Sequence, residues 1–336
     1  MKPFLERLTD SKPLVYDGGF GSQLFARGIE LTNSTLANDL HPEAVVTIHK
    51  DYISAGANAI GTNTFVASPL HLEMAERDSG EAAGLVKLAA EHARRAVEES
   101  GEDVYIAGSI GPSPGAIEAD SGGTDFGIAN DKVRAAHECV VNALADGGVD
   151  YLMIETQFSA KEAAMAVEIA SGTGLPIAVS MTYKHTKNRK TGEVIYRTDW
   201  GHSAGDLLDA LAGGEFSYGE DRIKDVQLFG LNCGAETQYA EHTGMPYGIE
   251  GLTQTRTALE DRGIVGKWMV AYPNAGMPFL DRTSQLTTYT QTPEDMAQHI
   301  SPILEAGASI VGGCCGTEPG HIQAFRSAVD AHAASR

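Results

Sequence analysis

Cysteine, aromatic residues and positive charge are all scarce in this chain of 336 residues. Four cysteines are too few for a disulfide framework, and two of them are adjacent, so we expect thiols that bind a metal or take part in catalysis. Lysine and arginine together number 25 against 45 acidic residues, which gives a formal net charge of −20. This balance argues against nucleic acid and anionic membranes as partners, and it is most simply explained by solubility.

Long apolar runs are missing as well. No stretch approaches the ~20 consecutive apolar residues that a membrane helix requires. The first eight residues, MKPFLERL, contain no apolar core of the kind found in a signal peptide. We therefore expect a soluble protein of the cytoplasm.

The chain does contain a regular alternation of short apolar runs and longer amphipathic segments. Such alternation predicts a parallel sheet, and eight repeats predict an α/β protein with the (β/α)8 TIM barrel fold. Since no linker or low-complexity segment interrupts the pattern, we predict a single domain over residues 1–336. The expected strands are Leu14–Asp17, Asn58–Thr62, Val104–Gly108, Tyr151–Glu155, Pro176–Met181, Gln227–Asn232, Lys267–Tyr272 and Ser309–Gly313. The expected helices are Pro42–Ala55, Glu81–Glu99, Lys132–Ala145, Ala160–Ala170, Ala204–Leu211, Leu252–Arg262, Pro293–Ala306 and Pro319–Ala334.

The longest irregular region lies between the fifth and sixth expected strands, at about 183–225. Its first part, Lys184–Trp200, is polar and basic, and Lys190-Thr191-Gly192-Glu193 is typical of a turn. We interpret this region as an insertion, and we expect a hairpin that lies over the mouth of the barrel as a lid.

Polar residues gather at the carboxyl ends of the expected strands, where barrel enzymes carry their active sites. The apolar runs alone define the strands, so the clustering of polar residues at their ends is evidence for a functional site. The residues are Asp17, Asn63, Glu155, Cys233, Asn274, Cys314 and Cys315.

The three strand-end cysteines have the composition of a zinc site. Cys233 closes the sixth strand and Cys314 and Cys315 close the eighth, and these two strands are second neighbours in a barrel. Three thiolates leave one position of a tetrahedral Zn²⁺ open, which is typical of a catalytic site. Buried cysteine is often only a small hydrophobic residue, and we assign that role to Cys139, which lies inside an expected helix. Adjacent cysteines flanked by glycines are different, because the glycines allow a bend that turns both thiols to one point.

An open position on zinc suggests activation of a thiol substrate. A free thiol titrates near pH ~8.5, whereas a thiol bound to zinc loses its proton. Such a site converts a small thiol into a nucleophile suited to attack on an activated methyl group. No catalytic residue beyond the metal ligands is predicted.

The segment Asp17-Gly18-Gly19-Phe20 follows the first strand and is a candidate substrate loop. Its backbone N–H groups are suited to a carboxylate, and Asp17 together with Glu155 is suited to an ammonium group. Two alternatives stay open, namely a glycine-rich turn with a capping Asp17 and a structural ion pair at Glu155. The spacing of a dinucleotide-binding loop is absent.

Seven short stretches of the chain together carry a resemblance to a known family. They are Asp17-Gly18-Gly19-Phe20, Gly61-Thr62-Asn63-Thr64-Phe65, Ile110-Gly111-Pro112, Ile154-Glu155-Thr156, Gly230-Leu231-Asn232-Cys233, Tyr272-Pro273-Asn274-Ala275-Gly276 and Gly313-Cys314-Cys315-Gly316-Thr317. In these motifs the chain resembles the homocysteine S-methyltransferase family over roughly residues 14–328. The Tyr272–Gly276 segment looks most like the homocysteine module of cobalamin-dependent methionine synthase.

The resemblance implies a (β/α)8 barrel with Zn²⁺ on Cys233, Cys314 and Cys315. It also implies homocysteine as the methyl acceptor, with Asp17, the following glycines and Glu155 at its amino-acid end. The residues we predict to bind substrate are Asp17, Gly18, Gly19, Phe20, Asn63, Glu155 and Asn274.

The methyl donor stays open. Betaine enzymes of the family carry a tyrosine where this chain has Thr156, which weakens betaine as the donor. A sulfonium compound and a methylcorrinoid on a separate protein are the two donors we retain. The alternatives to homocysteine methylation are a non-catalytic zinc or corrinoid-docking subunit, a redox pair at Cys314 and Cys315, and methyl transfer to a different small thiol.

Overall fold

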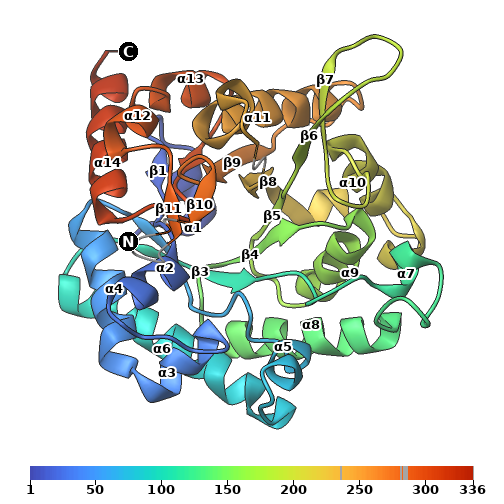
Figure 1. Cartoon of the computed structure of the whole chain (residues 1–336), viewed down its shortest axis with the longest axis horizontal. Coiled ribbons are helices and arrows are strands. Elements are labelled where there is room, and N and C mark those ends of the chain that lie inside the picture. The colour runs from blue at the N-terminus through green and yellow to red at the C-terminus, as the bar shows by residue number, and fades with distance from the viewer. Residues whose placement is uncertain (235–236, 281, 283–286, 336) are drawn as a thin grey trace.

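Eight parallel strands form the centre of the molecule in a computed structural model that describes residues 1–234, 237–280, 282 and 287–335 (Figure 1). Their order in the sheet is β1-β12-β9-β8-β5-β4-β3-β2, and a parallel bridge between Tyr16 and Ala59 closes the ring between its two ends. The predicted TIM barrel is thereby confirmed. The strands are β1 (Leu14–Val15), β2 (Ala59–Gly61), β3 (Tyr105–Ile110), β4 (Tyr151–Gln157), β5 (Ile177–Met181), β8 (Val226–Cys233), β9 (Trp268–Pro273) and β12 (Ile310–Val311).

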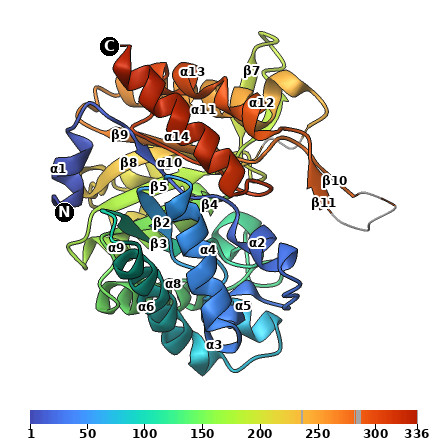
Figure 2. The same ribbon diagram turned by 90° about the vertical axis from the view of Figure 1, so that its left-hand side faces the viewer.

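Helices surround this ring and cover the outward faces of the strands with apolar residues (Figures 1 and 2). The α helices before β5 are α1 (Phe4–Leu8), α2 (Phe20–Ala26), α3 (Ala37–Leu40), α4 (Pro42–Ser54), α5 (Pro69–Met74), α6 (Ala82–Ser100), α7 (Glu118–Ser121), α8 (Asn130–Asp146) and α9 (Ala160–Ser171). Those after β5 are α10 (Ala204–Leu211), α11 (Gly244–Glu260), α12 (Pro293–Ala297), α13 (Ile300–Glu305) and α14 (Pro319–Ala334).

The inside of the barrel is filled by side chains from alternate strand positions, as expected for a ring of this size. At the amino-terminal end of the strands, α1 closes the barrel, because Phe4 stacks on Tyr151 with ring centroids 4.0 Å apart. Figure 2 shows α1 on the left, whereas α2 and the β10–β11 hairpin (Pro278–Leu280 and Thr287–Tyr289) lie on the right. The polar carboxyl ends of the strands therefore open on the side opposite to α1.

Two expected helices differ from the structure. The segment predicted as one helix over Pro293–Ala306 is divided into α12 and α13, because Pro302 has no N–H to donate to the carbonyl of Gln298. The helix expected at Leu252–Arg262 begins earlier, at Gly244, because tertiary packing overrides the low helix propensity of its glycines.

The first part of the 183–225 region is a hairpin, formed by β6 (Lys184–Lys187) and β7 (Val194–Arg197). The expected turn is present, with Gly192 at a φ of +76°. The hairpin lies at the edge of the barrel (Figure 1), and Gln254 of α11 donates to the carbonyl of Val194. These contacts hold the hairpin beside α11, and they do not support the expected lid over the mouth of the barrel.

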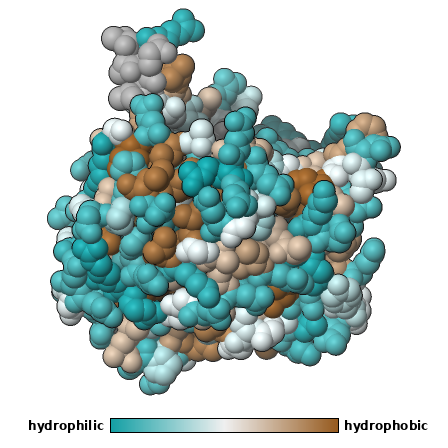
Figure 3. Space-filling model, turned by 90° about the horizontal axis from the view of Figure 1, so that it is seen from below, coloured by the Kyte–Doolittle hydropathy of each residue, from teal (hydrophilic) through white to brown (hydrophobic). Residues whose placement is uncertain are grey.

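Hydrophilic residues cover much of the face drawn in Figure 3, with hydrophobic patches between them. Within the described part of the chain, no helix is both long and apolar enough to cross a membrane. The expected cytoplasmic location stays a prediction.

Candidate functional site: three cysteines at the mouth of the barrel

A cavity of about 1600 Å³ opens at the carboxyl ends of the strands. Every residue predicted for the site lines it except Asn274. We call the part formed by Asp17, Glu155, Cys233, Tyr272, Cys314 and Cys315 the cysteine side. We call the part formed by Pro112, Asp120, Phe158, Glu162 and Trp200 the loop side.

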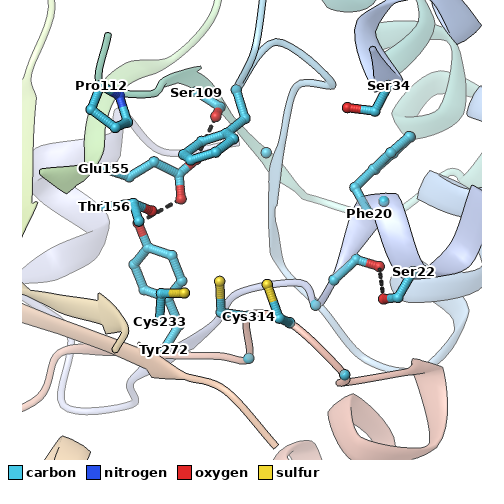
Figure 4. Close-up of a pocket in the computed structure, with 18 of the residues that line it drawn as sticks. Phe20, Ser22, Ser34, Ser109, Pro112, Glu155, Thr156, Cys233, Tyr272 and Cys314 are labelled. Atoms are coloured by element: carbon cyan, nitrogen blue, oxygen red, sulfur yellow. Dashed lines mark hydrogen bonds between the residues drawn. The ribbon is translucent and has the colours of Figure 1, made fainter. Parts of the chain in front are cut away.

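The sulfur atoms of Cys233, Cys314 and Cys315 lie within 4.8 Å of one another (Figure 4). Sulfurs that share a tetrahedral Zn²⁺ at ~2.3 Å are separated by about 3.8 Å, so small rotamer changes suffice to bring these three into coordination range. The residues present thus fit a metal ion bound by three thiolates.

Hydrogen bonds across neighbouring strands fix the cysteine backbone. The Cys314 N–H donates to the Pro273 carbonyl at 3.0 Å, and the Cys315 N–H donates to Asn274 Oδ1 at 3.1 Å. Asn274 is fully buried, so its side chain contacts the cysteine turn from behind. This geometry favours a positioning role for Asn274 over the direct contact with substrate that we expected.

One of the glycines that flank the adjacent cysteines has a left-handed backbone, which suits the expected bend. The left-handed glycine is Gly316, after the cysteines, with a φ of +78°. Gly312 and Gly313 are instead needed for close packing, because a Cβ on Gly313 would lie 2.3 Å from Thr317 Oγ1. Cys233 itself has a φ of +53°, an uncommon conformation for a residue with a side chain.

Without a metal, the neutral forms of Cys314 and Cys233 are favoured. Contacts with Cys233 and Cys315, together with burial, raise the pKa of Cys314 well above its ordinary value. The hydrogen bond with Cys314 lowers the pKa of Cys233, but Cys315 and burial outweigh it and raise that pKa to about 12. A divalent cation would reverse this balance, because it favours the thiolates.

Asp17 and Glu155 are both buried at the cavity wall. Asp17 Oδ2 accepts the Gly61 N–H at 2.9 Å, and burial raises the pKa of Asp17 well above its ordinary value. Burial likewise raises the pKa of Glu155 to about 7. The negative charge of Glu155 also raises the pKa of Asp17. Two buried carboxylates without a cation are unfavourable, so the pair is suited to receive a positively charged group.

Hydroxyl groups surround the Glu155 carboxyl (Figure 4). Ser109 donates to Oε1, and Tyr272 lies 3.0 Å from Oε2 and equally 3.0 Å from Ser180 Oγ. Ser180 donates its only hydrogen to Asn232 at 2.7 Å, so the single phenolic hydrogen serves either Glu155 or Ser180. A protonated Glu155 completes the chain by donating to Tyr272, which is consistent with its raised pKa.

The glycine loop is attached to the cysteine turn. The Gly19 N–H points to the Thr317 carbonyl and hydroxyl, each at 3.2 Å, and the Tyr52 hydroxyl reaches the Gly19 carbonyl at 3.0 Å. The Gly19 N–H is therefore not available to a substrate carboxylate. Phe20 packs on the buried ring of His49, with centroids 4.9 Å apart.

Asn63 lines the cavity but uses its amide within the protein. Its Nδ2 donates to the Ser34 carbonyl at 2.8 Å and to Asn38 Oδ1 at 3.2 Å. These contacts hold the segment after β2 against α3 and the turn that precedes it. The structure thus gives Asn63 a structural role beside its position at the cavity.

The loop side contains residues that the sequence did not single out. Glu162 is buried in the first turn of α9, accepts the Ser113 N–H at 2.6 Å and contacts His137 Nε2 at 3.0 Å. Despite its burial, these partners lower the pKa of Glu162 and keep it ionised. Asp120 is also buried, with Lys161 Nζ at 3.5 Å. A strand-end criterion cannot find such residues, because they lie in the short helix α7 and in the first turn of α9.

A barrel whose strand ends join three thiols and two buried carboxylates defines a class of candidate metal-dependent enzymes. Comparison with known proteins is consistent with that class. The family model for homocysteine S-methyltransferase matches residues 14–329, and the chain belongs to this family.

A relative and two solved structures show how far the likeness extends. Methionine synthase of Mycobacterium tuberculosis is 29% identical over 338 residues, which cover 94% of this chain but only 24% of that protein. The metallated form of the homocysteine methyltransferase MmuM from Escherichia coli matches with a TM-score of 0.68 and 23% identity, over 97% of this chain and 99% of that one. Its oxidized form matches with a TM-score of 0.69 over the same shares. The structural likeness supports the fold.

Proposed function

We propose that this protein transfers a methyl group to the sulfur of homocysteine and so forms methionine, with Zn²⁺ held by Cys233, Cys314 and Cys315. The observation that carries the proposal is the cluster of three sulfurs at the mouth of the barrel, beside two buried carboxylates. A zinc ion held there would supply an open position that favours the thiolate form of a substrate thiol.

The chain's own residues would orient the amino acid. Asp17 and Glu155 lie in the same cavity as the cysteines, and an ammonium group between them would favour the ionised carboxylates that burial disfavours. Tyr272 would keep its hydroxyl on Glu155 and so hold that carboxylate in place. Gly18 and Phe20 line the wall next to Asp17, where the carboxylate end of the substrate would lie.

The volume and charge of the cavity favour a second small substrate. About 1600 Å³ is far more than homocysteine alone would fill, since ordinary ligand pockets measure roughly 300–1,000 Å³. The loop side combines Asp120 and Glu162 with the aromatic rings of Phe158 and Trp200, an arrangement suited to a cation. A sulfonium donor is therefore our first candidate, and a methylcorrinoid on a separate protein is the second. We retain the methylcorrinoid because the chain matches a methionine synthase but covers only 24% of it. A corrinoid would then have to be supplied by a separate protein.

A donor panel tests this proposal. Zinc-loaded protein is incubated with homocysteine and either S-methylmethionine, dimethylsulfoniopropionate, betaine or methylcobalamin, and methionine is measured. We expect methionine from a sulfonium compound. One zinc per chain without methionine from any donor would favour a non-catalytic role, whereas product from another thiol would change the acceptor.

A further inference from the structure

The side chain of Asn232 lies between the Glu155 network and the cysteine cluster. It occupies the position before Cys233 in β8 and is fully buried. Its Oδ1 accepts the Thr156 N–H at 2.8 Å and the Ser180 hydroxyl at 2.7 Å. Its Nδ2 contacts Thr156 Oγ1 at 2.6 Å and Cys314 Sγ at 3.8 Å.

The orientation of this amide is determined by its partners. The Thr156 N–H can only donate, so the atom facing it must be the amide oxygen. The NH₂ group then faces Thr156 Oγ1 and the Cys314 sulfur, one hydrogen toward each. All four hydrogen-bonding positions of the amide are occupied, and a flipped amide would place donor against donor.

The backbone at Thr156 supports this arrangement. Thr156 has a φ of +56°, and the register between β4 and β5 shifts between Ile154 and Gln157. This bulge turns the Thr156 N–H and hydroxyl to the same amide. A left-handed threonine is costly and persists only where its surroundings require it.

We propose that Asn232 is a positioning residue of the metal centre, whose amide N–H donates to the Cys314 sulfur and withdraws electron density from it. The inference rests on the proposed metal site. A hydrogen bond to a ligand sulfur makes that sulfur less basic and less nucleophilic. Cys314 would then compete poorly for the methyl group, and the substrate sulfur, which lacks such a donor, would be the preferred acceptor.

Cobalt substitution tests the hydrogen bond without relying on activity. Co²⁺ is added to the metal-free wild type and to the Asn232→Asp variant, and the sulfur-to-cobalt charge-transfer bands are recorded. Asn232→Asp keeps the size and the Oδ1 acceptor but replaces the NH₂ by oxygen, so we expect the bands to move to lower energy. Ser180→Ala is the matched control, because it removes a bond to the other end of the amide and should leave the bands in place.

Methylation of the protein itself tests the consequence. Zinc-loaded wild type and variant are treated with methyl iodide; a Cys314 S–CH₃ bond forms, the C–I bond breaks and iodide leaves. Peptide mass spectrometry then gives the ratio of methylated Cys314 to methylated Cys315. We expect this ratio to rise severalfold in Asn232→Asp and to stay unchanged in Ser180→Ala.

The outcomes separate the two proposals. Wild type that binds no Co²⁺ would overturn the metal site itself. Bound Co²⁺ with identical bands and an identical methylation ratio in Asn232→Asp would overturn the role of Asn232 alone. If the variant does not fold, wild type loaded with a spin-active cadmium isotope replaces it, and a coupling from cadmium to the Asn232 side-chain protons is expected. Absence of that coupling would also refute the hydrogen bond.

Discussion

The cysteine side and the loop side of the cavity are built in different ways. On the cysteine side, side chains come from strand ends or the turn next to them, and buried hydrogen bonds fix them, as for the Cys315 N–H on Asn274. On the loop side, Asp120 and Trp200 come from long connections, and Trp200 is 42% exposed. The contrast suggests that reaction geometry is fixed by the sheet, whereas recognition of a second substrate is left to segments that change easily.

The two sides also differ in whether their buried carboxylates already have partners that stabilise the charge. Burial without a cation raises the pKa of both Asp17 and Glu155. Ionised carboxylates on the cysteine side are therefore unfavourable until a cation binds there. On the loop side Glu162 already has His137 and the Ser113 N–H, and its pKa is lowered. Ligands should therefore change the protonation of the cysteine side far more than that of the loop side.

The largest effect is expected from removing one of the three sulfur atoms on the cysteine side. Cys233→Ala should lose the metal and lower the rate of methionine formation by at least about 1000-fold, because two thiolates hold Zn²⁺ far less tightly than three. Metal content per chain and activity are the measurements. Cys139→Ala is the control, since Cys139 lies in α8 away from the cavity and should keep both. A Cys233→Ala protein with full zinc would contradict the assignment.

A smaller effect is expected at the proposed ammonium subsite around Glu155. Glu155→Gln keeps the shape but removes the charge, so KM for homocysteine should rise about 10- to 100-fold, as for a lost charge-assisted hydrogen bond of ~1.5–3 kcal/mol. The matched probe is 4-mercaptobutanoate, which has the same thiol and carboxylate but no amine. Its affinity should hardly change in the variant, and an equal loss for both thiols would show that Glu155 does not bind the amine.

Much of the cysteine side could be predicted from sequence, because each side chain directly follows a short apolar run. Cys233 and Cys314 lie about 80 residues apart, yet the rule that strand ends share one face of a barrel places them together. Asn274 shows the limit of that rule. It follows β9 as expected, but it is buried behind the cysteine turn, and the direction of a side chain beyond the last strand residue is not periodic.

Other residues could not be predicted because their partners are set by the tertiary structure. Ser109 and Ser180 are ordinary small residues of buried strands until the ring brings them to Glu155 and Asn232. Trp200 follows a hairpin whose direction no local pattern determines. The break between α12 and α13 was easier to predict, because Pro302 by itself indicates that a helix is interrupted.

The free energy of unfolding should reveal the cost of burying the ionised Glu155 carboxylate. The Glu155 carboxyl has a pKa of about 7 in the folded protein against an ordinary 4.5, so the folded state is favoured at low pH and loses this contribution as pH rises through about 7. At higher pH the cost in the metal-free protein is up to about 3 kcal/mol. Glu155→Gln should therefore unfold at higher urea concentration than wild type above pH 7. The difference should shrink below pH 5, and a difference that does not depend on pH would rule out this cause.

The smallest effect is expected at the β6–β7 hairpin, which tests whether it acts as a lid. Replacing Asn188–Glu193 by Asn-Gly keeps β6 and β7 paired through a two-residue turn. Because the cavity is lined by Asp199 and Trp200 and not by the tip of the hairpin, kcat/KM for homocysteine should change less than about twofold. Trp200→Ala is the informative companion, since it alters the loop side itself and should raise KM for the donor while leaving that for homocysteine unchanged. A large loss from the shortened hairpin would show that it moves over the mouth during turnover, and the loop side would then include it.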